Sequence, residues 1–233
     1  MTPPARTSAP PLTWLALLLS VTTGLVDAIS VLGLGKVFTA NMTGNVVFLG
    51  FAVVGTPGFH FPPYLAAMLF FLIGALIAGQ TGRAQRGKPL RRWLLLAAMI
   101  ETLALWLAAI IATGFDIASQ SPSAALYAII TLTALAMGFR NATIRQLKIP
   151  EVTTTVLTLT LTGLAADSTL AGGTNLNWAR RLGSVIAIFA GASLGAALVF
   201  HVGLVAPLIL AGFLVLAGTA VCALHPASTQ PIG

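Results

Sequence analysis

Charged residues are scarce in this sequence. Of its 233 residues only 7% are Asp, Glu, Lys or Arg, whereas 57% are hydrophobic. A soluble domain carries about 25% charged residues to keep its surface hydrated, so this composition excludes a soluble globular domain. Apolar runs such as residues 93–115 and 182–200 are long enough, as helices, to cross a hydrocarbon layer about 30 Å thick. We therefore expect an all-α polytopic membrane protein.

Residues that carry catalysis or bind metals are also few. The single cysteine, Cys222, excludes an internal disulfide and lies in an apolar run, where a lone cysteine behaves as a small hydrophobic residue. The histidines are His60, His201 and His225, and none has a partner at the spacing that metal ligation on one element requires. No HExxH motif is present, and the GxSxG string at residues 191–195 lies inside a long apolar run rather than at the strand-to-helix turn that a nucleophilic serine requires. We expect no enzyme activity, no metal and no cofactor.

The net charge of +7 is distributed in short basic clusters between the apolar runs. Such clusters are typical of the cytoplasmic loops of membrane proteins. A nucleic-acid partner is not expected, because no aromatic and basic groove or binding motif accompanies the charge. The composition predicts the lipid bilayer as a partner. We also consider a homodimer, because six crossings in a chain of this size are few to enclose a transport path.

Eight apolar stretches divide the chain at residues 12–34, 37–55, 62–82, 92–115, 122–146, 152–166, 181–200 and 202–224. Residues 1–10 are expected to form a disordered tail and residues 225–233 a C-terminal tail, so the membrane domain spans residues 11–224. The stretches 37–55 and 152–166 are polar at one end, and the second of them is short for a crossing.

Basic residues decide between topologies. If all eight stretches cross and the N-terminus is cytoplasmic, nine of the twelve basic residues lie outside; with the N-terminus outside, three do. If stretches 37–55 and 152–166 enter the membrane and return, only Lys36 lies outside. The last arrangement fits the positive-inside rule best. We therefore expect six crossings, two short broken or re-entrant segments and a cytoplasmic N-terminus.

The two halves of the chain resemble one another. An offset of 114 residues places Asp27 on Asn141 and Thr39 and Asn41 on Thr153 and Thr155. We interpret this as a duplication, with one repeat over about residues 11–115 and the other over about residues 121–224. Three crossings in each half make the repeats inverted, as in many secondary transporters, where broken helices meet near the midplane to bind solute.

Two strings resemble a known family. GLVDAISVLGLGKVFTANMTGNVVFLG (residues 24–50) and MGFRNATIRQLKIPEVTTTVLTLTLTGLAAD (residues 137–167) are similar to the YoaK-like family of small bacterial membrane proteins, whose function is largely unknown. The resemblance implies a multi-pass protein of the bacterial inner membrane with two related halves, and it implies no substrate.

Polar residues inside the apolar stretches are the candidates for a solute site. Asp27 lies within the first stretch, where an ionised carboxylate is costly unless it faces a partner or water; it is either a solute, cation or proton site or a structural cap on the following turn. Polar residues alternate with apolar ones in the two short segments. Their side chains either line a cavity or form hydrogen bonds with backbone carbonyl groups of their own helix. The candidate substrate-binding residues are Asp27, Asn41, Thr43, Asn45, Asn141, Thr153 and Thr155.

Two further charges lie inside apolar stretches. Glu101 is either part of a site or paired with a basic group near the inner face, such as Arg83 or Arg91, and we favour the pairing. Arg140 is expected to snorkel toward the cytoplasmic surface, with pairing to Asp27 or Glu101 as the alternative. The sequence therefore predicts a small-solute transporter or channel with a site between the repeats; the alternative is a scaffold or partner-binding membrane protein that transports nothing.

A third pattern concerns helix packing. Gly74 with Ala78, and Gly191 with Gly195, have the small-xxx-small spacing that lets two membrane helices approach closely.

Overall fold

The computed structural model describes residues 10–147, 157–175 and 177–230. In this part of the chain all regular structure is helical, and six helices are long and apolar enough to cross a membrane. The six are α1 (Pro10–Gly33), α3 (Phe61–Ala84), α4 (Leu90–Ala112), α5 (Ser123–Gln146), α7 (Trp178–Val202) and α8 (Val205–Leu224). Two shorter apolar helices accompany them, α2 (Met42–Val53) and α6 (Leu157–Ala166). The predicted fold class, an all-α polytopic membrane protein with two short segments, is confirmed.

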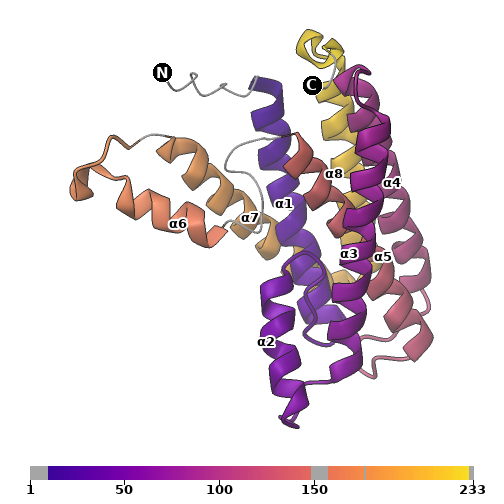
Figure 1. Ribbon diagram of the computed structural model, residues 1–233. Coiled ribbons are helices and arrows are strands. Elements are labelled where there is room, and N and C mark those ends of the chain that lie inside the picture. The colour runs from indigo at the N-terminus through magenta and orange to yellow at the C-terminus, as the bar shows by residue number, and fades with distance from the viewer. Residues whose placement is uncertain (1–9, 148–156, 176, 231–233) are drawn as a thin grey trace.

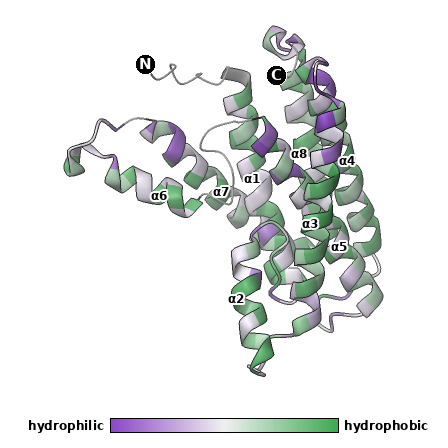
Figure 2. Ribbon diagram, in the orientation of Figure 1, coloured by the Kyte–Doolittle hydropathy of each residue, from purple (hydrophilic) through white to green (hydrophobic). Residues whose placement is uncertain are grey.

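Hydrophobic residues cover most of the helices, and hydrophilic ones gather at one end of the bundle (Figure 2). That end carries the connection between α3 and α4, the start of α1 and the end of α8 (Figure 1). We call it the basic end, since Arg83, Arg86, Lys88, Arg91 and Arg92 all lie in or beside the α3–α4 connection. The opposite end holds the connections between α4 and α5 and between α7 and α8.

Glycines set the closest contacts between helices. A Cβ added to Gly74 of α3 would lie 2.1 Å from the Leu135 carbonyl oxygen of α5, and one added to Gly191 of α7 would lie 1.9 Å from the Val21 carbonyl oxygen of α1. The two backbones in each pair therefore touch directly, which only a residue without a side chain permits. The predicted packing role of both glycines is confirmed.

The segment between α1 and α3 turns back into the bundle. Leu34, Val37, Thr39 and Ala40 are at most 2% exposed, and the backbone of Ala40 acts electrostatically on the carboxyl group of Asp27. Asp27 lies six residues before the end of α1, about 9 Å into the bundle along the helix axis. Helix α2 therefore begins inside the bundle and runs back toward the end from which the segment entered, beside α3 (Figure 1).

The other short helix, α6, packs on α7, which in turn packs on α1 (Figure 1). One side of α2 and one side of α6 are exposed in the single chain, including Val46 and Val47 on α2 and Leu159 on α6. Neither short helix is enclosed by the other described helices, and its exposed side carries both apolar residues and threonines.

Candidate functional site

A buried ion pair joins three helices in the half of the bundle nearer the basic end. The Arg140 guanidinium of α5 donates through Nη2 to the Glu101 carboxylate of α4. Its Nη1 donates to the Leu19 carbonyl oxygen of α1 at 3.1 Å and to the Thr23 hydroxyl at 3.0 Å. The Arg140 and Glu101 side chains are only 2% and 5% exposed. A charged pair in such a place needs close and complete pairing, because removing both charges from water costs several kcal/mol per ion.

The pair corrects one expectation and confirms the main part of another. Arg140 does not snorkel to the cytoplasmic surface; it points into the bundle and is paired with Glu101, the alternative that we favoured less. The favoured pairing of Glu101 with a basic residue is confirmed, but its partner is Arg140 and not Arg83 or Arg91, because the register of α4 against α5 places it opposite Arg140. Thr23, which completes the pair on α1, was not singled out from the sequence. Its spacing of four residues from Asp27 places both on one side of α1 and was the signal that could have found it.

Asp27 lies one helical turn beyond Thr23 on α1. Its Oδ1 is fully buried and has no hydrogen-bond partner among the described residues. The backbone amide of Ala40 and the Arg140 guanidinium both act on the carboxyl group. Asp27 therefore sits between the ion pair on one side and the segment that returns toward α2 on the other.

Asn45 fixes the returning segment. Its side-chain oxygen accepts a hydrogen bond from the Phe38 backbone N–H at 2.9 Å, and its amide nitrogen donates to the Phe38 carbonyl oxygen. Both polar groups of this fully buried side chain are used by the backbone of the same segment. Thr39 follows Phe38, and its buried hydroxyl has no partner among the described residues. Asn41 and Thr43 lie at the start of α2 and are exposed.

The second half contributes Asn141, which follows Arg140 on α5. Its side chain donates to the Met137 carbonyl oxygen at 2.9 Å, one turn earlier on the same helix. Thr153 and Thr155 lie outside the described residues. On α6 the Thr162 hydroxyl donates back to the Thr158 carbonyl oxygen at 2.9 Å, which is the local bonding that we considered as the alternative to a cavity.

The structure therefore brings together Asp27, Glu101 and Arg140, with the segment that Asn45 fixes beside Asp27. It does not bring Asn41 and Thr43 into the same buried group. The role of all of these residues in binding a solute stays a prediction.

A small cavity of about 30 Å³ lies against the ion pair. Glu101, Arg140 and Thr143 line it, together with Leu15, Leu94 and Leu147. Leu15 lies near the start of α1, Leu94 near the start of α4 and Leu147 just after α5, so the cavity lies on the side of the basic end. Its volume suits one or two water molecules, and charged groups in its wall give such waters hydrogen-bond partners.

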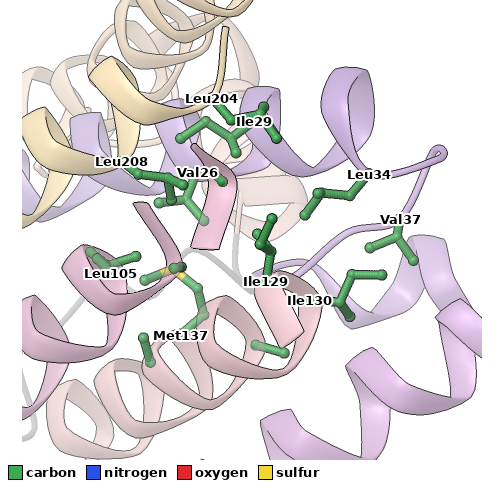
Figure 3. Packing of buried hydrophobic residues seen from close by; sticks show 14 of the residues in the cluster. Val26, Ile29, Leu34, Val37, Leu105, Ile129, Ile130, Met137, Leu204 and Leu208 are labelled. Atoms are coloured by element: carbon green, nitrogen blue, oxygen red, sulfur yellow. The ribbon is translucent and has the colours of Figure 1, made fainter. Parts of the chain in front are cut away.

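A continuous apolar cluster fills the other half of the bundle. Figure 3 shows Val26 and Ile29 of α1 packed near Leu204 and Leu208 at the start of α8, with Ile129 and Ile130 of α5 close to Val37. All seven residues are at most 3% exposed. This cluster separates Asp27 from the end of the bundle opposite the basic end. We call it the apolar seal.

Comparisons with known proteins agree with the membrane fold. The profile of the family described as "Protein of unknown function (DUF1275)" matches residues 15–221. The UPF0700 transmembrane protein YoaK of Bacillus subtilis (strain 168) is 36% identical over 152 residues, which span 64% of this chain and 64% of that protein, a little less than two thirds. No solved structure matches the chain. The chain is a multi-pass membrane protein that belongs to the DUF1275 family of proteins of unknown function, as its resemblance to YoaK-like proteins implied.

Proposed function

We propose that this protein is a small-solute transporter of the bacterial inner membrane, with its site around Asp27, Glu101 and Arg140. The observation that carries the proposal is the buried ion pair beside an Asp27 carboxyl oxygen that has no hydrogen-bond partner in the described part of the chain. Charged residues within membrane spans are costly and commonly mark pathways for ions and solutes. Apolar residues in place of Arg140 and Glu101 would avoid the cost of removing two charges from water. We propose transport rather than catalysis because no known catalytic motif accompanies these residues.

The contacts between helices support two inverted halves. Gly24 of α1 faces the Ile188 carbonyl oxygen of α7, and Gly138 of α5 faces the Phe71 carbonyl oxygen of α3. Gly24 and Gly138 differ by 114 residues, the offset at which the halves of the sequence resemble one another. Gly191 and Gly74 face α1 and α5 in the same reciprocal way. The packing of α1 on α7 thus repeats that of α5 on α3, and three crossings per half would make the repeats antiparallel.

Basic residues support a cytoplasmic N-terminus. Arg83, Arg86 and Lys88 lie at the end where α1 begins, and Arg180 and Arg181 lie at the start of α7, which the six-crossing arrangement places on the same side. The opposite end carries the exposed carboxylate of Asp116 in the α4–α5 connection. We infer that the basic end is cytoplasmic.

Cysteine labelling tests this orientation. In a Cys222→Ala background, Ala84→Cys and Thr174→Cys should react with an impermeant maleimide only after the membrane is opened. Ala118→Cys should react in intact cells. All three residues are exposed. Labelling of Ala84→Cys and Thr174→Cys from opposite sides would contradict the six-crossing topology.

The packing supports an inward-facing state. The cavity beside the ion pair lies on the basic side, whereas the apolar seal closes the other side. A transporter alternates between such states around a fixed site.

A thermal-shift screen followed by counterflow tests the transport proposal. The purified protein is melted with acetate, phosphate, glycine, glycerol or glucose, because a ligand that binds only the folded state raises the melting temperature. The best solute is then loaded into proteoliposomes, and uptake of its labelled form is followed. We expect stabilisation and counterflow in the wild type and loss of both in Arg140→Leu. Stabilisation without counterflow would favour the binding-protein alternative.

A further inference from the structure

The buried charges near the membrane centre do not balance. Arg140 neutralises Glu101, which leaves the carboxyl group of Asp27 without a cation of its own among the residues that the structure describes. An ionised carboxylate in such a place is expensive unless a cation accompanies it. One positive charge is therefore missing from the described part of this group.

The elements packed on α1 do not supply that charge. Helices α5, α7 and α8 pack against α1. Helix α5 brings Arg140 near Asp27 and carries Arg145 at its end; α7 carries Arg180 and Arg181 at one end and His201 at the other; α8 carries Cys222 near its end, with His225 following. In the returning segment the charged residue is Lys36, which is exposed and lies over the Phe59 ring at 5.3 Å. Among these groups Arg140 is the cation that acts on Asp27, and Glu101 already holds it.

We propose that Asp27 binds one proton as the coupling ion of the transporter, and that Arg140 is shared between Glu101 and Asp27 according to whether that proton is bound. This inference rests on the proposed function. With the proton bound, Asp27 is neutral and Arg140 stays with Glu101, as in this structure. When the proton leaves, the carboxylate attracts the guanidinium, which already contacts Thr23 one turn away on α1.

A proton suits this place better than a metal ion. Hard cations such as calcium and magnesium take about six to eight oxygen ligands. Near Asp27 the segment offers one further unpartnered side-chain oxygen, that of Thr39, and an Ala40 amide whose positive end repels a cation. A single proton needs only the carboxyl oxygen that lacks a partner.

Asp27 and the ion pair lie toward different ends of the bundle. The cavity on the basic side ends at Glu101 and Arg140, and the segment that enters from the other side ends at Asp27. Arg140 stands between them. Its movement from Glu101 toward Asp27 would change the contact between α5, α4 and α1, the three helices that it joins. Proton loss would thus be linked to a rearrangement of the two halves.

Infrared difference spectroscopy of the reconstituted full-length protein tests the inference without any solute. A protonated carboxylic acid has a carbonyl stretching band that the carboxylate lacks. We expect this band in the wild type at neutral pH, its loss at high pH, and its absence from Asp27→Asn. Asp116→Asn removes the same charge from an exposed loop and should leave the band unchanged. Glu101→Gln should reduce the neutral-pH band at least twofold, because Arg140 is then free to pair with Asp27.

Three results would overturn the proton-binding inference. The first is no band in folded wild type at neutral pH, and the second is a band that survives in Asp27→Asn. The third is a band that appears only when choline replaces sodium, which would assign the site to a metal cation. If Asp27→Asn does not fold, Asp27→Glu keeps a carboxyl group and should shift the band rather than remove it, and an unshifted band would also overturn the inference. Because the spectra require no flux, they separate a failure of the proton site from a failure of the transport proposal, which counterflow reports.

Discussion

Replacing Gly138 by alanine should push two membrane helices apart. The added Cβ would lie 1.9 Å from the Phe71 carbonyl oxygen, whereas ordinary van der Waals contact begins at 3.4 Å. The backbones of α5 and α3 must therefore separate by more than about 1 Å. Overpacking of this kind costs roughly 1–3 kcal/mol, and the better helix propensity of alanine offsets up to about 1 kcal/mol.

Gly50→Ala is the matched control. Gly50 lies in α2, and a Cβ at that position has no atom within 4 Å. Both variants share the gain in helix propensity, so the difference between their unfolding free energies isolates the overpacking cost, about 1–3 kcal/mol. The free energies are measured by SDS-induced unfolding in mixed micelles. Gly138→Ala unfolding at the same or a higher SDS fraction than Gly50→Ala would refute the close helix contact.

Four further variants test the polar contacts. Arg140→Leu should lose about 3–5 kcal/mol because it leaves Glu101 buried without a cation, and the double variant with Glu101→Leu should recover most of it in the same assay. Asn45→Leu should free the returning segment, seen as faster hydrogen exchange of its amides than in wild type. Hydrogen bonds from Ser119 lower the pKa of the exposed Asp116 carboxyl group, so this loop gains stability above the ordinary pKa of aspartate and loses it as the pH falls through the lowered value. NMR titration should show that Ser119→Ala raises this pKa.

The spans were predictable because their signal is local. Each long apolar run became a helix whose ends lie within a few residues of the expected ones; the run at 62–82, for example, became Phe61–Ala84. The returning segment was also predictable, since its polar residues at 39–45 cannot lie in lipid without partners. Asn45 provides the physical reason. Its side chain satisfies the hydrogen-bonding groups of the Phe38 backbone, so that an extended segment can be buried.

The pairing inside the bundle was not predictable in the same way. Whether Arg140 meets Glu101, 39 residues away, or turns to the surface depends on how α4 and α5 are rotated and shifted, and both helices are apolar around most of their circumference. The hydrophobic pattern that sets helix rotation in soluble proteins is therefore weak here. Close contacts of Gly74 and Gly138 with opposing carbonyl oxygens fix the register of α3 on α5 instead.

Spin-label distances at the two ends of the bundle test alternating access most directly. One pair of labels is placed beside the apolar seal, at Leu32 and Ser123, and the other at the basic end, at Ala84 and Arg145; all four residues are exposed. In liposomes we expect two distances for each pair, with populations that shift in opposite senses when the pH or the bound solute changes. A single distance for each pair, unchanged across pH and across the solutes of the screen in the folded protein, would contradict transport by alternating access.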